Sequence, residues 1–270
     1  MKKQSSWILL LLSITVVFTT LSWISIDKSH SLSNVYTSNT SNISKTTRVA
    51  NVEEQFEQYV TGIYNTAELG KTQLDYSVFK KALIGYINLK NSEQLSEKQL
   101  LTIVDFNKSS SLKRLWIIDL AQQKLLYNTL VAHGQGSGLD MANKFSNIEN
   151  SHQSSLGFYI TSDIYAGKHG RSIRLDGMDK DFNSNAKNRA VVIHGAKYVS
   201  QQFIDQTGRL GRSHGCPALP VELTNQIINN IKGRTCLFIA GPQKNYVSEY
   251  INQDLAINSF LVAKAKAPTL

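Results

Sequence analysis

The sequence has little cysteine: only Cys216 and Cys236 occur among its 270 residues. This scarcity limits the chain to one disulfide. No cysteine lies near the hydrophobic N-terminal segment, which excludes lipoprotein attachment. Cys236 lies in an apolar run (235–240) typical of a buried strand, whereas Cys216 lies in a His-Gly-Cys-Pro turn. We therefore interpret Cys236 as a small core residue and Cys216 as a free thiol, with a disulfide between them as the alternative.

Charge is missing from a long stretch near the N-terminus, because no charged residue occurs between Lys3 and Asp27. Residues 7–26 are mostly apolar and numerous enough to span a bilayer as a helix. The two preceding lysines favour a cytoplasmic N-terminus and export of the remainder. Residues 1–26 are thus predicted to be a signal anchor inserted in the inner membrane, or else a cleaved signal peptide. The rest of the chain is expected in the periplasm or cell envelope.

Residues 27–51 contain few large apolar side chains and are rich in Ser, Thr and Asn, which predicts a flexible linker. The chain carries a net charge of +9. Its Lys and Arg residues are scattered rather than clustered beside aromatic residues, and this pattern argues against a nucleic-acid partner. An exported basic protein meets anionic lipids and wall polymers instead.

Hydrophobic spacing then predicts a small helical module over residues 52–110. Three helices are expected in this module. The first has an apolar face from Phe56 to Tyr64, and the second is capped by Asp75. The third begins at Ser96 and contains residues 100–104. We expect this module to pack against the domain that follows it.

Residues 111–241 alternate short apolar runs with glycine-containing turns. Strands are expected at 114–120, 124–133, 156–161, 172–175, 190–194 and 235–240, with one helix at 221–231. Such short strands with few helices predict a mainly β fold built on a curled or sandwich-like mixed sheet. Residues 242–270 are weakly patterned and are treated as a C-terminal tail.

A cysteine and a histidine in this region have the surroundings of a catalytic pair. His194 ends the apolar run 191–193, and Cys216 stands between Gly215 and Pro217. A thiol needs a nearby base or cation to react readily near neutral pH, and histidine titrates in that range. A glycine before the nucleophile lets backbone N–H groups approach a reacting carbonyl. We interpret Cys216 as a nucleophile and His194 as its base, rather than as a structural histidine.

These motifs resemble a known family. An apolar strand ending in His194-Gly195, followed by Ser213-His214-Gly215-Cys216, resembles the L,D-transpeptidase (YkuD-like) catalytic domain. Residues 132–138, 144–147, 154–157 and 165–170 are similar to its murein L,D-transpeptidase branch, so the resemblance extends over about 112–241. It implies that Cys216 attacks the bond before the terminal D-residue of a peptidoglycan tetrapeptide stem and passes the acyl group to an amine, without a cofactor or metal.

The resemblance also implies individual roles. The base His194 would be oriented by the Gly195 carbonyl, while Ser213 and His214 would shape the pocket. The backbone N–H groups of Gly215 and Cys216 would bind the developing oxyanion.

Two features depart from the family pattern. Eighteen residues separate His194 from Ser213, slightly more than usual. Pro217 and Ala218 follow the nucleophile, where the family usually has an apolar residue and then Asn or Arg. We hypothesise that Arg174, Arg209 or Arg212 binds substrate instead, since guanidinium groups suit carboxylates. His133, in a glycine-rich loop, is expected to line the cleft.

Three alternatives remain. The same thiol could use water as acceptor, which would make the protein an L,D-carboxypeptidase. His194, His214 and Cys216 could bind zinc, although a close His-x-Cys pair lacks a typical partner. The chain could also be a non-catalytic wall-binding protein with a degenerate site.

Overall fold

The computed structural model describes residues 51–266. The predicted anchor or signal peptide (1–26) and the predicted linker up to residue 50 lie outside the described residues. Within residues 51–266, no helix is both long enough and apolar enough to cross a membrane.

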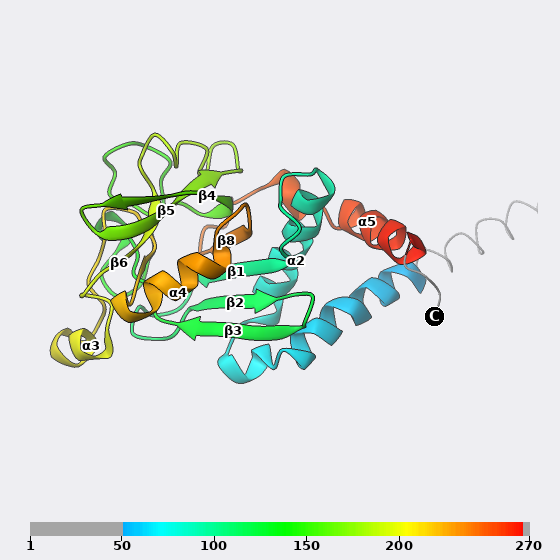
Figure 1. Cartoon of the computed structure of the whole chain (residues 1–270), viewed down its shortest axis with the longest axis horizontal. Helices are drawn as coiled ribbons and strands as arrows, with labels where there is room; N and C mark the ends of the chain where they lie inside the picture. Colours follow the sequence, from blue (N-terminus) through cyan, green and yellow to red (C-terminus); the bar gives the residue numbers. More distant parts are fainter. Residues whose placement is uncertain (1–50, 267–270) are drawn as a thin grey trace, which may run out of the picture. The chain divides into compact units, whose positions relative to one another are not determined.

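A mixed sheet of eight strands forms the centre of the described chain, in the order β3-β2-β1-β8-β4-β5-β6-β7 (Figure 1). The strands are β1 (Leu100–Asp105), β2 (Leu115–Asp119), β3 (Lys124–Thr129), β4 (Gly157–Gly167), β5 (Gly170–Gly177), β6 (Val192–Gly195), β7 (Ala218–Leu219) and β8 (Cys236–Ala240). β1 pairs with β8, and β6 with β7, in parallel, and the other neighbours are antiparallel. The predicted β-rich fold with a curled mixed sheet is confirmed.

Helices complete the described chain. They are a helix over 51–66, η1 (Leu69–Thr72), α2 (Tyr76–Asn91), η2 (Gln135–Ser137), α3 (Gln201–Thr207), α4 (Val221–Ile231), η3 (Glu249–Ile251) and α5 (Gln253–Lys266). Asp75 caps α2 as predicted, because its side chain accepts hydrogen bonds from the backbone N–H groups of Ser77 and Val78. The predicted helix over 221–231 is confirmed with both of its bounds.

Helices α2 and α4 lie on opposite faces of the sheet (Figure 1). Alternate residues of one strand point to the two faces, so that Phe238 in β8 joins the core beneath α2 and Leu237 joins the core beneath α4. Gly85 lets α2 approach closely, since a Cβ there would lie 2.0 Å from the Phe158 ring. The sheet is therefore held between two apolar cores.

The predicted third helix is wrong. Residues 100–105 form β1, which lies inside the sheet between β2 and β8. They therefore belong to the sheet rather than to the predicted helical module. All six side chains of β1 are buried, so the strand shows no alternation of apolar and polar residues that would distinguish it from a helix.

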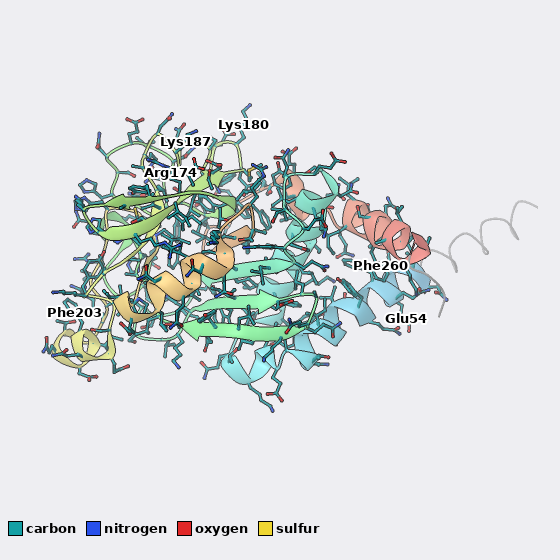
Figure 2. The ribbon with its side chains drawn as sticks, viewed as in Figure 1. Glu54, Arg174, Lys180, Lys187, Phe203 and Phe260 are labelled. Carbon is teal, nitrogen blue, oxygen red and sulfur yellow. The ribbon has the colours of Figure 1, made fainter. Side chains whose placement is uncertain are left out.

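The predicted C-terminal tail is also more ordered than expected. It contains α5, on which Ala256 and Ile257 are buried. Phe260 of α5, which is labelled in Figure 2, meets Phe56 of the helix over 51–66, and the two ring centroids are 5.7 Å apart. The two ends of the described chain thus share the core beneath α2.

Candidate active site

Cys216 and His194 line the same cavity, which has a volume of about 660 Å³. The sheet brings them there, because His194 in β6 pairs with Ser172 in β5 on one side and with Ala218 in β7 on the other. Cys216 precedes Ala218 by two residues, so the register of β6 and β7 places the loop of the cysteine beside the end of the histidine strand. The tip of the β4–β5 hairpin, with Lys168 and His169, forms another wall.

The two cysteines are both free thiols but have different surroundings. Cys216 is partly exposed, and its Sγ lies 3.6 Å from the carbonyl oxygen of Ala190. Burial raises the pKa of the Cys216 thiol, whereas the Val192 N–H and the positive charge of Arg189 lower it. Cys236 is 0% exposed, within β8, and burial raises the pKa of its thiol strongly. Only Cys216 of the two can meet a substrate.

His194 is oriented by its own strand. Its Nδ1 lies 3.0 Å from the Gly195 carbonyl oxygen. Since a carbonyl only accepts, we assign the proton to Nδ1, which leaves Nε2 as an acceptor. The ring of His169 stacks on that of His194, with centroids 4.4 Å apart.

Burial lowers the pKa of His194 below its ordinary value of ~6.5. The shifts of Cys216 and His194 both favour neutral forms, so the resting pair at neutral pH is a thiol and an imidazole. The imidazole can then act as a general base that removes the thiol proton during attack, rather than as the partner of a standing thiolate.

The motif residues form a tight turn around the nucleophile. Ser213 Oγ donates to the Cys216 carbonyl oxygen at 2.6 Å and accepts from the Gly215 N–H at 3.0 Å. Gly215 has φ 124°, and a Cβ there would lie 2.8 Å from the Gln153 carbonyl oxygen, so only glycine fits. The Gly215 N–H, expected to bind the oxyanion, is thus already engaged by Ser213. His214 is exposed in the cavity and stacks on His152, with centroids 4.3 Å apart.

The three candidate substrate arginines occupy different places. Arg212 lines the cavity, and its Nη1 donates to the Gly138 carbonyl oxygen at 2.9 Å. Arg174, which lies on β5 and is labelled in Figure 2, places its guanidinium over the Tyr165 ring, 4.5 Å from the ring centroid. Arg209 donates to the Leu210 carbonyl oxygen at 2.7 Å. Arg212 alone of the three borders the cavity.

His133 does not line the cleft, and that expectation is wrong. Its side chain is 0% exposed, and its Nδ1 accepts a hydrogen bond from Arg114 Nη2 at 2.8 Å. The backbone carbonyl of His133 accepts from the Ser213 N–H at 2.9 Å, which joins this segment to the motif loop while the imidazole lies in the interior against Phe106.

Arg189 lines the cavity, although no sequence motif pointed to it. Its guanidinium donates to the carbonyl oxygens of Ser146 and Gln153, at 2.6 Å each, and to the hydroxyls of Ser151 and Ser155. Such contacts join segments far apart in the sequence, and no local pattern indicates them.

Zinc binding by His194, His214 and Cys216 was the alternative use of these residues. Within residues 51–266, no three His, Cys, Asp or Glu side chains gather in an arrangement that could hold a metal ion.

Comparison with known proteins gives one sequence match. Residues 70–240 match the sequence model of the L,D-transpeptidase catalytic domain. The sequence has no significant match among curated proteins.

Solved structures also align with parts of the chain. An L,D-transpeptidase from Mycobacterium smegmatis aligns at 11% identity and a TM-score of 0.34, over 53% of this chain and 59% of the other. The helical cell shape determining protein from Campylobacter jejuni aligns at 13% identity and a TM-score of 0.37, over 66% of this chain and 63% of the other. The chain thus spans less than two thirds of either protein.

Proposed function

Because the chain belongs to the L,D-transpeptidase catalytic domain family, we propose that it is a cysteine acyltransferase acting on peptidoglycan tetrapeptide stems. The observation that carries this proposal is the shared cavity, in which a partly exposed Cys216 thiol and a His194 imidazole with an acceptor Nε2 occur together. A binding protein would need neither group.

The proposed reaction has two halves. Cys216 Sγ attacks the carbonyl carbon of the bond before the terminal D-residue while His194 Nε2 takes the thiol proton. The C–N bond then breaks, the imidazolium returns the proton to the leaving amine, and a thioester remains on Cys216. An acceptor amine attacks the thioester, gives its proton to His194, and releases Sγ, which regains that proton.

The charge of the cavity supports an acidic peptide as substrate. Lys168, Arg189 and Arg212 line it, and no Asp or Glu is among its lining residues. Two Nη1 hydrogen bonds to backbone carbonyls hold Arg212 in place. We assign the substrate carboxylate contact to Arg212 rather than to Arg174 or Arg209, which do not border the cavity.

The location of this substrate fits the predicted export of the chain. Stem peptides lie outside the cytoplasmic membrane, so the proposed reaction needs an extracytoplasmic enzyme. An N-terminal anchor over residues 7–26 would hold such an enzyme near new wall material, and this assignment stays a prediction because those residues lie outside the described part.

The proposal is tested by incubating the protein with a disaccharide-tetrapeptide and separating the products by mass. We expect cross-linked dimers and released D-alanine with the wild type, no products with Cys216→Ser, and products with the matched control Cys236→Ser. Trimmed monomers without dimers would identify a carboxypeptidase with the same thiol. Unchanged substrate with the wild type, or full activity in Cys216→Ser, would refute the proposed function.

A further inference from the structure

Arg189 lies beside both the thiol and the motif turn. It directly precedes Ala190, whose carbonyl oxygen is 3.6 Å from Cys216 Sγ. Its guanidinium also approaches Gly215, since a Cβ built there would be 3.4 Å from Arg189 Nη2. The charge is therefore placed next to the atoms that react in the proposed function.

The partners of this guanidinium are all neutral. Its Nη1 and Nη2 donate to two backbone carbonyls and two serine hydroxyls, all within residues 146–155. The ion pairs of the described residues, Lys71–Glu68, Lys80–Glu57 and Lys90–Glu97, do not include it. The carboxylate of Glu149 acts on this charge through space but makes no ion pair with it. A half-buried charge that lacks a paired counterion is costly.

The hydrogen bonds also decide which role the guanidinium can take. Each Nη group already makes two hydrogen bonds, which is all that its hydrogens allow. Arg189 is thus poorly suited to grip a substrate carboxylate with its paired donors. Its positive charge, in contrast, stays available to a negative charge that forms nearby.

We propose that Arg189 is a positioning residue that stabilises the Cys216 thiolate by its charge and locks the 146–155 loop against the nucleophile turn. This inference rests on the proposed role of Cys216 as nucleophile. In agreement with it, the charge of Arg189 lowers the pKa of the Cys216 thiol against the effect of burial, and Lys168 of the β4–β5 hairpin has a smaller effect in the same direction.

The test measures the rate of Cys216 alkylation by iodoacetamide as a function of pH, in a background of Cys236→Ser. For Arg189→Gln we expect a pH midpoint above that of the wild type and about tenfold slower alkylation at pH 7, as loss of a nearby opposite charge implies. Arg189→Lys, which keeps the charge, should stay near the wild-type midpoint. Lys124→Gln, an equal loss of charge at the opposite edge strand β3, should leave the midpoint unchanged.

A second pair of variants, at Ser151, leaves Arg189 unchanged. Ser151→Asp puts a carboxylate where Arg189 Nη2 now donates to a hydroxyl at 3.2 Å, which neutralises the guanidinium. We expect Ser151→Asp to raise the midpoint and its uncharged match, Ser151→Asn, to leave it unchanged. If Arg189→Gln does not fold, an unchanged midpoint in Ser151→Asp alone overturns the inference.

The outcomes separate this inference from the proposed function. Midpoints that stay at the wild-type value in both Arg189→Gln and Ser151→Asp, even with lowered thermal stability, would show a purely structural role and overturn the inference. Alkylation requires only a thiol, so it reports on Arg189 even in a protein that transfers no acyl group. Failure of the proposed function would appear separately, as absence of products from the wild type with the tetrapeptide.

Discussion

Acidification should destabilise the folded chain through the buried side chain of His133. Burial and the adjacent Arg114 guanidinium lower the pKa of His133 from 6.5 to about 4. Between these two values the unfolded state binds a proton that the folded state does not, so stability is lost as pH falls from 6.5 to about 4 and then levels off for this group. The difference of about 2.5 units corresponds to roughly 3 kcal/mol at 1.36 kcal/mol per unit.

The assay is urea unfolding of the wild type and of His133→Gln at several pH values from 7 to 4.5. Glutamine keeps an acceptor for Arg114 but does not titrate. We expect the wild type to lose about 2 to 3 kcal/mol more than the variant across this range. The lowered pKa of His194 acts in the same direction in both proteins, so the difference between them isolates His133. Equal pH dependence in the two proteins would refute the reasoning.

Two further predictions concern packing and the general base. Gly85→Ala should lower the free energy of unfolding by about 1 to 3 kcal/mol, because the added Cβ would meet the Phe158 ring. The control Gly62→Ala, whose Cβ would meet nothing within 4 Å, should be neutral or stabilising because alanine favours a helix. Equal effects of the two variants in thermal unfolding would contradict this packing. In a plot of kcat/KM against pH, the midpoint of the acidic limb should lie below ~6.5, because burial lowers the pKa of His194 and the neutral imidazole is the proposed base. A midpoint above that value would contradict the assignment of His194 as the base.

Short apolar runs separated by turns, together with a helix N-cap residue, were enough to predict much of the fold. The runs at 114–120 and 235–240 became β2 and β8, and Asp75 caps α2 as expected. β1 was missed because its apolar run follows Ser96-Glu97-Lys98-Gln99, which resembles a helix capping box, and because its six buried side chains show no alternation that would argue against a helix. α5 was missed because, among its residues 253–265, only Ala256 and Ile257 are deeply buried, too few to produce a clear apolar stripe.

The candidate site was predictable only where its residues form a contiguous motif. His194 and the turn at 213–216 occur together in one cavity, as their spacing suggested. Arg189 makes its hydrogen bonds with residues 34 to 43 positions away, and His133 points into the core beside Arg114. Both facts depend on tertiary contacts that no local pattern encodes.

The central claim is that the thiol of Cys216 is the nucleophile of the site. Its most direct test is the intact mass of the protein after exposure to a carbapenem, followed by peptide mapping of the adduct. We expect one covalent acyl group on Cys216, retained in Cys236→Ser and absent in Cys216→Ser. An unmodified wild type, or an adduct that persists in Cys216→Ser, would contradict the claim.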